Sequence, residues 1–509
     1  MIKKFSFKDL LFTGLAIVYF TPLVNVISWI VYSLTIHHNF LIYFSSISFF
    51  EKIRNSIFLS TAVSTGSVVI GGLFTYLFYC FRSPWHRSGM LLLLLSFFAI
   101  SPIIYLVALT RLHCFNQLPV FWQSVQVLSL NMSPLAAIIF IFSIGTLENA
   151  SIKSALMISK PSAVVRHIIF PQIKFSVITA FLIVFMLIFI HEEVPSFLGY
   201  RTYAEESLAR IVAMENYKEA SLASLPFLFL GIIALVVSGL MLRRFNKYHR
   251  HGNNLSLMKF HMNTPKTHIT AGSILLFIAV GGLVFLLLKE LNFYSVDELV
   301  ADNISSIQNT FILSFVTAIV GTICGGFLYK RLRTGSHVRE LVLWSGVMMF
   351  YWLTPSSLCM LALVHLSRLF HCDSIIFDYL ILCFGYLLRL LPISFLLFAA
   401  MSTITKTRQD IFLRFIKLSA YNQFWKIILP LHWHMWLIIY AVLSVFVMNE
   451  VSATVLLIPP GVETIVVRIY NLMHYGDFSS VAFLSLVQVT LVFICVAMTQ
   501  LMMKFYDKA

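Results

Sequence analysis

The sequence predicts an all-α integral membrane protein with about twelve transmembrane helices in two similar six-helix halves. Composition predicts the class: 59% of the 509 residues are hydrophobic and only 11% are charged, whereas soluble domains carry about 25% charged residues. Apolar runs of roughly 20 residues, the length that crosses about 30 Å of hydrocarbon, recur along the whole chain. An internal repeat predicts the two halves.

Twelve apolar runs are long enough to span a bilayer. In chain order they lie at 11–33, 57–80, 89–109, 125–147, 173–190, 224–242, 269–288, 307–329, 342–365, 379–401, 431–449 and 480–503. Basic loops stay on the cytoplasmic side of a membrane, and cytoplasmic termini would put 26 of the 36 lysines and arginines on that side. The sequence therefore predicts a multi-pass protein with both termini in the cytoplasm.

The same topology explains the formal net charge of +15. The basic residues lie in short loops at helix ends, where anionic lipid headgroups attract them. The expected partner of these charges is therefore the lipid bilayer and not a nucleic acid, which a basic protein could otherwise bind.

The repeat consists of residues that recur at offsets of 253 to 259. The mates are Asn55-Ser56 with Asn309-Thr310, Gly71-Gly72 with Gly325-Gly326, Ser101-Pro102 with Thr354-Pro355, Pro134 with Pro392, Pro171 with Pro430, and Glu192 with Glu450. Six helices per half is an even number, so both halves share one orientation about an axis along the membrane normal. We expect a first half at 1–243, a basic cytoplasmic linker at 244–268 and a second half at 269–509.

Each half has a basic loop between its fourth and fifth helices that shows a helical pattern before a proline. The loops cover 148–171 and 409–430. Proline is tolerated in the first turn of the next helix because that N–H has no partner anyway. From the residues alone, each loop is either an amphipathic segment lying in the headgroups or a surface that receives a push from a soluble motor.

The two loops resemble the signature cytoplasmic loop of ABC importer permeases, where a Glu-Ala-Ala triplet is followed by a Gly and then by Leu-Pro. Phe170-Pro171 and Leu429-Pro430 stand at the Leu-Pro place, whereas Ile158 and Lys417 stand at the Gly place. The Glu place holds Ile152 and Ile411, so the family's Glu is not carried over. The resemblance implies ATPase-coupling loops that contain Ser154, Ile158, Pro171, Lys417, Ser419, Phe424 and Pro430.

The segment from Asn449 to Gly476 is similar to the stretch after the fifth helix in the fused permeases of ferric iron, thiamine and polyamine importers. The stretch from Glu192 to Thr202 resembles its first-half equivalent. This resemblance implies the type I ABC importer permease fold, in a bacterial inner membrane. It also implies two partners, a dimer of cytoplasmic ATPase subunits and a periplasmic substrate-binding protein.

The chain contains no Gly-x-x-x-x-Gly-Lys-[Ser/Thr] phosphate loop. ATP and Mg²⁺ are therefore expected on the partner ATPase, and this chain is expected to be neither an enzyme nor a cofactor-binding protein. The resemblance favours ferric iron as cargo, with thiamine, polyamine and phosphonate as alternatives. The main rival class is an ion-gradient-driven secondary transporter, which can also have parallel halves but would carry acids within its spans, whereas nearly all acids here lie in loops.

Ionisable groups at membrane depth mark a pathway or a partner. Glu192, Arg210, Glu450 and Arg468 lie at the outer ends of the two fifth helices or in the segments that follow, and Tyr475 comes shortly afterwards. These residues form either the outer gate of a substrate pathway or Glu–Arg pairs that hold each re-entrant segment to its own half.

Arg389 is a strong charge in the middle of an expected span, and its repeat mate is the uncharged Asn131. Lipid exposure would cost an arginine at least roughly 2.5 kcal/mol. Arg389 is therefore expected to line the pathway or to have a buried partner.

Two His-Cys pairs recur in expected outer loops, His113-Cys114 and His371-Cys372. Repeat ancestry alone explains them, although two thiols and two imidazoles could also form a disulfide or hold a soft metal.

Overall fold

The structure is a computed structural model. It describes residues 47–81, 83–145, 154–207, 281–291, 296–335, 356–370, 374–404 and 429–508 apart from a few single positions, together with isolated residues at 20–31, 147, 225–233 and 348. All regular elements in these ranges are helices, which confirms the all-α class for the described part of the chain.

The first group of helices comes from residues 47–198. They are α3 (Ile47–Cys80), α4 (Pro84–Ala99), α5 (Pro102–Leu109), α6 (His113–Asn116), α7 (Val120–Gly145), α9 (Pro161–Val164), the π-helical turn η1 (Val165–Ile169), α10 (Phe170–Phe189) and α11 (Glu193–Leu198). Prolines open several of them: Pro84, Pro102 and Pro171 stand in first turns, where the missing N–H costs nothing.

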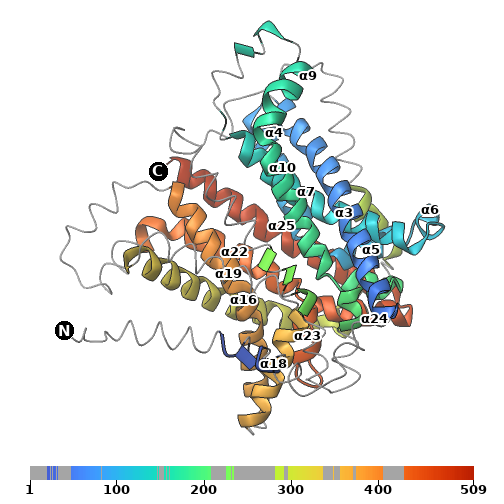
Figure 1. Cartoon of the computed structure of the whole chain (residues 1–509). Helices are drawn as coiled ribbons and strands as arrows, with labels where there is room; N and C mark the ends of the chain where they lie inside the picture. Colours follow the sequence, from blue (N-terminus) through green and yellow to red (C-terminus); the bar gives the residue numbers. More distant parts are fainter. Residues whose placement is uncertain are drawn as a thin grey trace, which may run out of the picture.

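The second group comes from residues 296–508. It contains α16 (Val296–Gly335), α18 (Ser356–Phe370), α19 (Ile375–Ile404), α22 (Leu429–Met448), α23 (Ser452–Leu457), α24 (Ile465–Tyr475) and α25 (Phe478–Lys508). In Figure 1, α3, α7 and α10 form one bundle, α16, α19 and α22 form another, and the long α25 lies between them. α25 packs against α22 and α24 on one side and against α4 on the other.

Within the described residues, six helices are long and apolar enough to cross a membrane, or seven if a bent pair counts as one span. The bent pair is α4 and α5, which cover the expected span at 89–109: the chain turns by 91° at Ser101-Pro102, so this stretch is either a broken span or a re-entrant loop. Pro102 has no N–H to continue the helix, and its ring restricts the preceding residue to extended conformations. The expected spans at 11–33, 224–242 and 269–288 lie largely outside the described residues, as does the first part of 342–365.

Exposed apolar surface runs along the long helices, as a bilayer requires. Phe311, Phe315, Ile319 and Ile323 of α16 follow one another every four residues, and each is more than a third exposed. Buried apolar residues lie on the opposite faces. One cluster joins α5 and α7 to α24 and α25, and another packs α19 against α22 and α16.

Repeat mates make the same contacts in the two groups. α3 packs against α7 and α10, and α16 packs against α19 and α22. The Asn55 amide donates to the Arg201 carbonyl at 3.1 Å, and its mate Asn309 donates to the Glu463 carbonyl at 3.2 Å. The hydroxyls of the next residues accept a backbone N–H at 2.8 Å, Ser56 from Tyr203 and Thr310 from Ile465. The segments at 201–203 and 463–465 are therefore fixed to α3 and α16 in the same way.

Two glycines that are mates in the repeat, Gly71 and Gly325, lie where long helices pack closely against each other. A Cβ on Gly71 would be 2.8 Å from the Ala136 Cβ and 2.8 Å from the Ser133 carbonyl oxygen of α7. A Cβ on Gly325 would be 2.6 Å from the Ser394 Cβ of α19. Small residues allow such close backbone approach between membrane helices.

We expect Gly71→Ala to lower the thermal unfolding midpoint of the detergent-solubilised chain, because the contacts at Gly71 include backbone atoms that cannot rotate away. Overpacking of this kind costs about 1–3 kcal/mol. The matched control is Gly72→Ala, because a Cβ there meets no atom within 4 Å, and alanine is the better helix former. Equal midpoints for the two variants would contradict the close crossing.

Candidate functional site

Charged and polar side chains gather where α10 and α22 end, and we call this site the polar junction. It comprises His191, Glu192 and Glu193 after α10, Asn449, Glu450 and Ser452 after α22, and Arg389 of α19. The first three residues come from the first repeat and the others from the second.

Arg389 has an acidic partner at the junction. Its Nη1 donates to Glu450 Oε1 at 2.8 Å, and the same oxygen accepts the Ala453 backbone N–H at 3.3 Å. The side chains are 29% and 13% exposed. Of the two interpretations of Arg389, these contacts favour the one in which it has a partner, Glu450. The same Glu450 oxygen also binds a backbone N–H in the first turn of α23.

Glu192 has no equivalent arginine. It is 4% exposed, and its Oε1 has no hydrogen-bond partner within the described part of the chain. The Ser452 side chain, from the other repeat, lies near this carboxylate and lowers its pKa. The asymmetry has a clear origin: where the second repeat has Arg389, the first has Asn131, whose amide instead donates to the Ile100 carbonyl at 2.8 Å.

The polar junction therefore holds three carboxyls and one arginine. Beyond the end of the α10 span, burial raises the pKa of Glu192 and of Glu193 above the ordinary value. The charge of Glu450 raises both further, and the charge of Arg389 lowers both. Burial lowers the pKa of His191, as does Arg389, so this imidazole is neutral and does not supply a second positive charge.

The bend between α4 and α5 is tied into the same region. A bend leaves backbone carbonyls without their helical partners, and in apolar surroundings such groups must be satisfied by other donors. The Asn449 amide donates to the Ala99 carbonyl at 2.6 Å, and Asn131 caps Ile100. Gln488 of α25 in turn donates to Asn449 Oδ1 at 3.1 Å.

Arg468 of α24 donates hydrogen bonds to residues outside the polar junction and ties its own segment to α16. It donates to Asn303 Oδ1 of α16 at 2.6 Å and to Glu463 at 2.7 Å. These contacts fit the interpretation in which Glu–Arg pairs hold each segment to its own half of the chain. Tyr475 is 84% exposed at the end of α24, and Arg210 lies outside the described residues.

The first expected coupling loop is partly described. Ser154 and Pro171 are exposed, and Ile158 is 87% exposed beside Met157 at 88%. The loop then enters η1, a π-helical turn, before Pro171 in the first turn of α10. Pro430 lies in the first turn of α22. Lys417, Ser419 and Phe424 lie outside the described residues.

The expected His-Cys pairs are half described. His113 and Cys114 lie in the short α6, where Cys114 is an exposed free thiol. His371 and Cys372 lie outside the described residues, so their pairing stays a prediction. Across the described ranges, no group of three or more His, Cys, Asp or Glu side chains is suited to hold a metal ion.

Several junction residues were not predicted from the sequence. His191 and Glu193 flank Glu192 but are mates of the uncharged Asn449 and Val451. The repeat pattern therefore does not mark them as candidate site residues. Asn131 was noted only as the mate of Arg389. An asparagine or glutamine within an apolar span is costly unless paired, and this signal would have selected Asn131 and Gln488.

Comparison with known proteins adds no relative: no protein-family model, no curated protein and no solved structure matches the chain.

We expect Arg389→Met to lower the free energy of unfolding by about 2 kcal/mol, below the 3–5 kcal/mol of a fully buried pair because both groups keep some exposure. The loss arises because Glu450 is left as an unpaired charge. The double variant Arg389→Met/Glu450→Gln should recover much of it, as measured by denaturant unfolding in detergent micelles. Lys174→Gln, at an exposed position of α10, is the control. A double variant no more stable than Arg389→Met would contradict the pairing.

The pKa directions also predict a pH dependence. A carboxyl whose pKa is raised by folding holds its proton more tightly when folded, so its contribution to stability falls as pH rises from the ordinary value of 4.5 through the raised value. We expect Glu193→Gln to remove part of this fall. In thermal unfolding scans, the unfolding midpoint of the variant should therefore rise relative to that of the parent as pH increases. Glu298→Gln, at an exposed position, should leave the slope unchanged. Parallel curves for Glu193→Gln and the parent would show that Glu193 is not held in this environment.

Proposed function

We propose that this chain is the membrane-spanning permease of an ATP-driven importer, with two repeats that move against each other. The observation that carries the proposal is the polar junction. Ser452 and Arg389 of the second repeat lie near the buried Glu192 of the first, and Asn449 of the second donates to the Ala99 carbonyl of the first. Contacts of this kind across a repeat boundary suit a gate, because their loss exposes polar groups that can line a pathway.

The matched contacts of the repeats support the type I permease fold of twelve helices in two halves. Asn55 and Asn309 fix equivalent segments in equivalent ways. A rigid unit of this kind transmits a displacement at one membrane face to the junction at the other. Rigid rocking of two such units is how parallel repeats achieve alternating access.

The exposed loop before α10 supports an external motor. Met157 and Ile158 expose almost their whole side chains beside the first turns of α10, and exposed apolar groups mark protein contacts. In this proposal they dock the ATPase dimer, which binds ATP and Mg²⁺, and a periplasmic binding protein delivers cargo at the opposite face in a bacterial inner membrane. Ferric iron remains the first proposed cargo, followed by thiamine, polyamine and phosphonate.

The buried acids favour one second candidate, an ion-gradient-driven secondary transporter. Such a carrier needs carboxyls that change protonation within the membrane domain, and Glu192 and Glu193 have raised pKa values for which burial is the largest cause. This candidate needs no partner motor. It therefore makes the opposite prediction for transport by the isolated chain.

Proteoliposomes separate the two candidates. We expect uptake of radiolabelled ferric ion, thiamine or spermidine only when the chain is reconstituted with its ATPase subunits and binding protein and supplied with ATP. Ile158→Asp should weaken co-purification of the ATPase about tenfold, as expected when an apolar contact is replaced by a desolvated charge. Ile376→Asp is the control, because Ile376 is 70% exposed in the first turn of α19 and lies outside the two expected coupling loops. Uphill uptake by the chain alone with an ion gradient would overturn the importer proposal and support the second candidate.

A further inference from the structure

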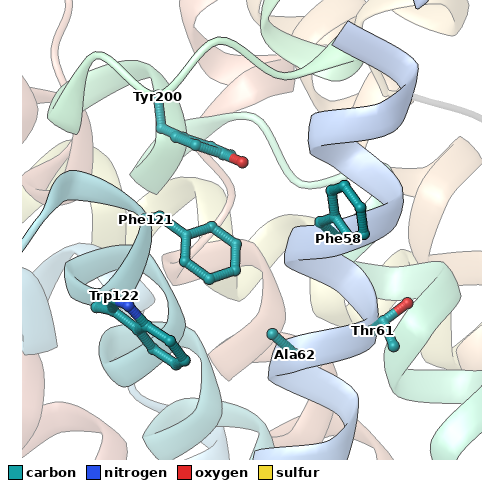
Figure 2. A pocket seen from close by; sticks show the side chains of 6 residues that line it. All are labelled: Phe58, Thr61, Ala62, Phe121, Trp122 and Tyr200. Carbon is teal, nitrogen blue, oxygen red and sulfur yellow. The ribbon is translucent and has the colours of Figure 1, made fainter. Parts of the chain in front are cut away.

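An apolar groove lies between α3 and α7, away from the polar junction. It has a volume of about 520 Å³ and is lined by Phe58, Thr61, Ala62, Phe121, Trp122 and Tyr200. Figure 2 shows Phe121 and the Tyr200 ring facing the space from one side, with Phe58 and Ala62 on the opposite wall. The volume falls within the range of small-molecule sites, roughly 300–1,000 Å³.

Part of the groove wall is exposed within the part of the chain that the structure describes. Phe58 and Trp122 are 58% and 52% exposed, and both belong to helices that meet the criteria for membrane spans. The Thr61 hydroxyl donates to its own helix at the Ile57 carbonyl, at 2.7 Å. The Trp122 indole and the Tyr200 phenol are therefore the remaining side-chain polar groups of the wall. An extended peptide in this groove would leave most of its backbone groups unpaired, whereas a hydrocarbon chain has none to pair.

One end of the groove carries a positive charge. Arg54 lies one turn before Phe58 on α3 and is exposed. Asn55 holds the Arg201 carbonyl at 3.1 Å, which fixes the adjacent Tyr200 beside this turn of α3. Burial raises the pKa of Tyr200, and the nearby charge of Arg54 opposes that rise. The Arg54 charge therefore acts on the Tyr200 phenol, and the Asn55 bond holds the backbone next to Tyr200 against the same turn of α3.

Two of the acids nearby, Glu205 and Glu206, have other basic neighbours. Glu206 pairs with Lys52 at 2.5 Å, and Glu205 lies in the field of Lys52 and Arg201. No carboxylate lies within ion-pair distance of Arg54 in the part of the chain that the structure describes. A planar guanidinium beside a phenol hydroxyl is a donor set that matches a phosphate.

We propose that this groove binds one phospholipid, with an acyl chain along Phe58, Phe121 and Trp122 and the phosphate at Arg54 and the Tyr200 hydroxyl. Aromatic side chains at the depth where headgroup meets hydrocarbon suit both parts of such a molecule. The site is independent of the transport proposal, since it uses none of the junction residues.

Native mass spectrometry of the full-length chain, released from gentle detergent, tests retention of the lipid. We expect one phospholipid per chain in the parent and about tenfold lower occupancy in Arg54→Gln, as expected for loss of one charge-assisted hydrogen bond. Ala62→Phe, which fills the groove, should also lose the lipid. Val69→Phe is the matched control, because Val69 is 59% exposed on the same helix and does not line the groove. Equal retention in the parent and Arg54→Gln, or no retention in the parent, would overturn the proposal.

Fluorescence gives an independent test in a bilayer. The difference between the parent and Trp122→Phe isolates the emission of Trp122, and brominated phosphatidylethanolamine in nanodiscs should quench that difference signal. The quenching should decrease in Arg54→Gln but not in Lys174→Gln. An unquenched Trp122 signal would show that a protein segment covers the groove, and this outcome would also overturn the proposal.

Discussion

The ion pair between Arg389 and Glu450 is the interaction on which the polar junction depends. One guanidinium supplies the positive charge that three clustered carboxyls share. An uncompensated carboxylate in such surroundings would cost several kcal/mol. Because Glu450 Oε1 also accepts the Ala453 N–H, the pair positions the start of α23 and with it Ser452, whose side chain lies near Glu192. The contact between the repeats therefore follows from an interaction within one of them.

The contacts that repeat mates share account for the frame around the site, and the differences between mates account for the site itself. Contacts that hold the segments at 201–203 and 463–465 are the same in both repeats, as Asn55 and Asn309 show. At the centre the mates differ: Arg389 faces an acid, whereas Asn131 caps a broken helix. Glu450 therefore has an ion-pair partner within its own repeat. The residues that shift the pKa of Glu192 come from the other repeat.

The helical class and the positions of the long described helices could be predicted from the sequence, because hydrophobic runs and repeat spacing are local signals. The bend at Ser101-Pro102 was missed because a proline between two apolar stretches is compatible with a kinked or a straight span. The site was predicted in part: Glu192, Glu450 and Arg389 stood out as charges in apolar surroundings. Their pairing could not be predicted, since it depends on how α19 crosses α22 and on which side chains lie across a repeat boundary. Asn449 and Gln488 are distant in sequence from the carbonyls that they bind, and no spacing rule connects them.

The bond from Asn449 to the Ala99 carbonyl spans 350 positions of the chain. A carbonyl at a helix end in apolar surroundings needs a hydrogen-bond donor. If the repeats separate at this point, water must replace the amide as the donor to the carbonyl. Separation of the repeats at the bend is thus accompanied by hydration of the Ala99 carbonyl. Hydration and separation of the two bundles would occur together, which makes a dry, half-separated arrangement the least stable state along that motion.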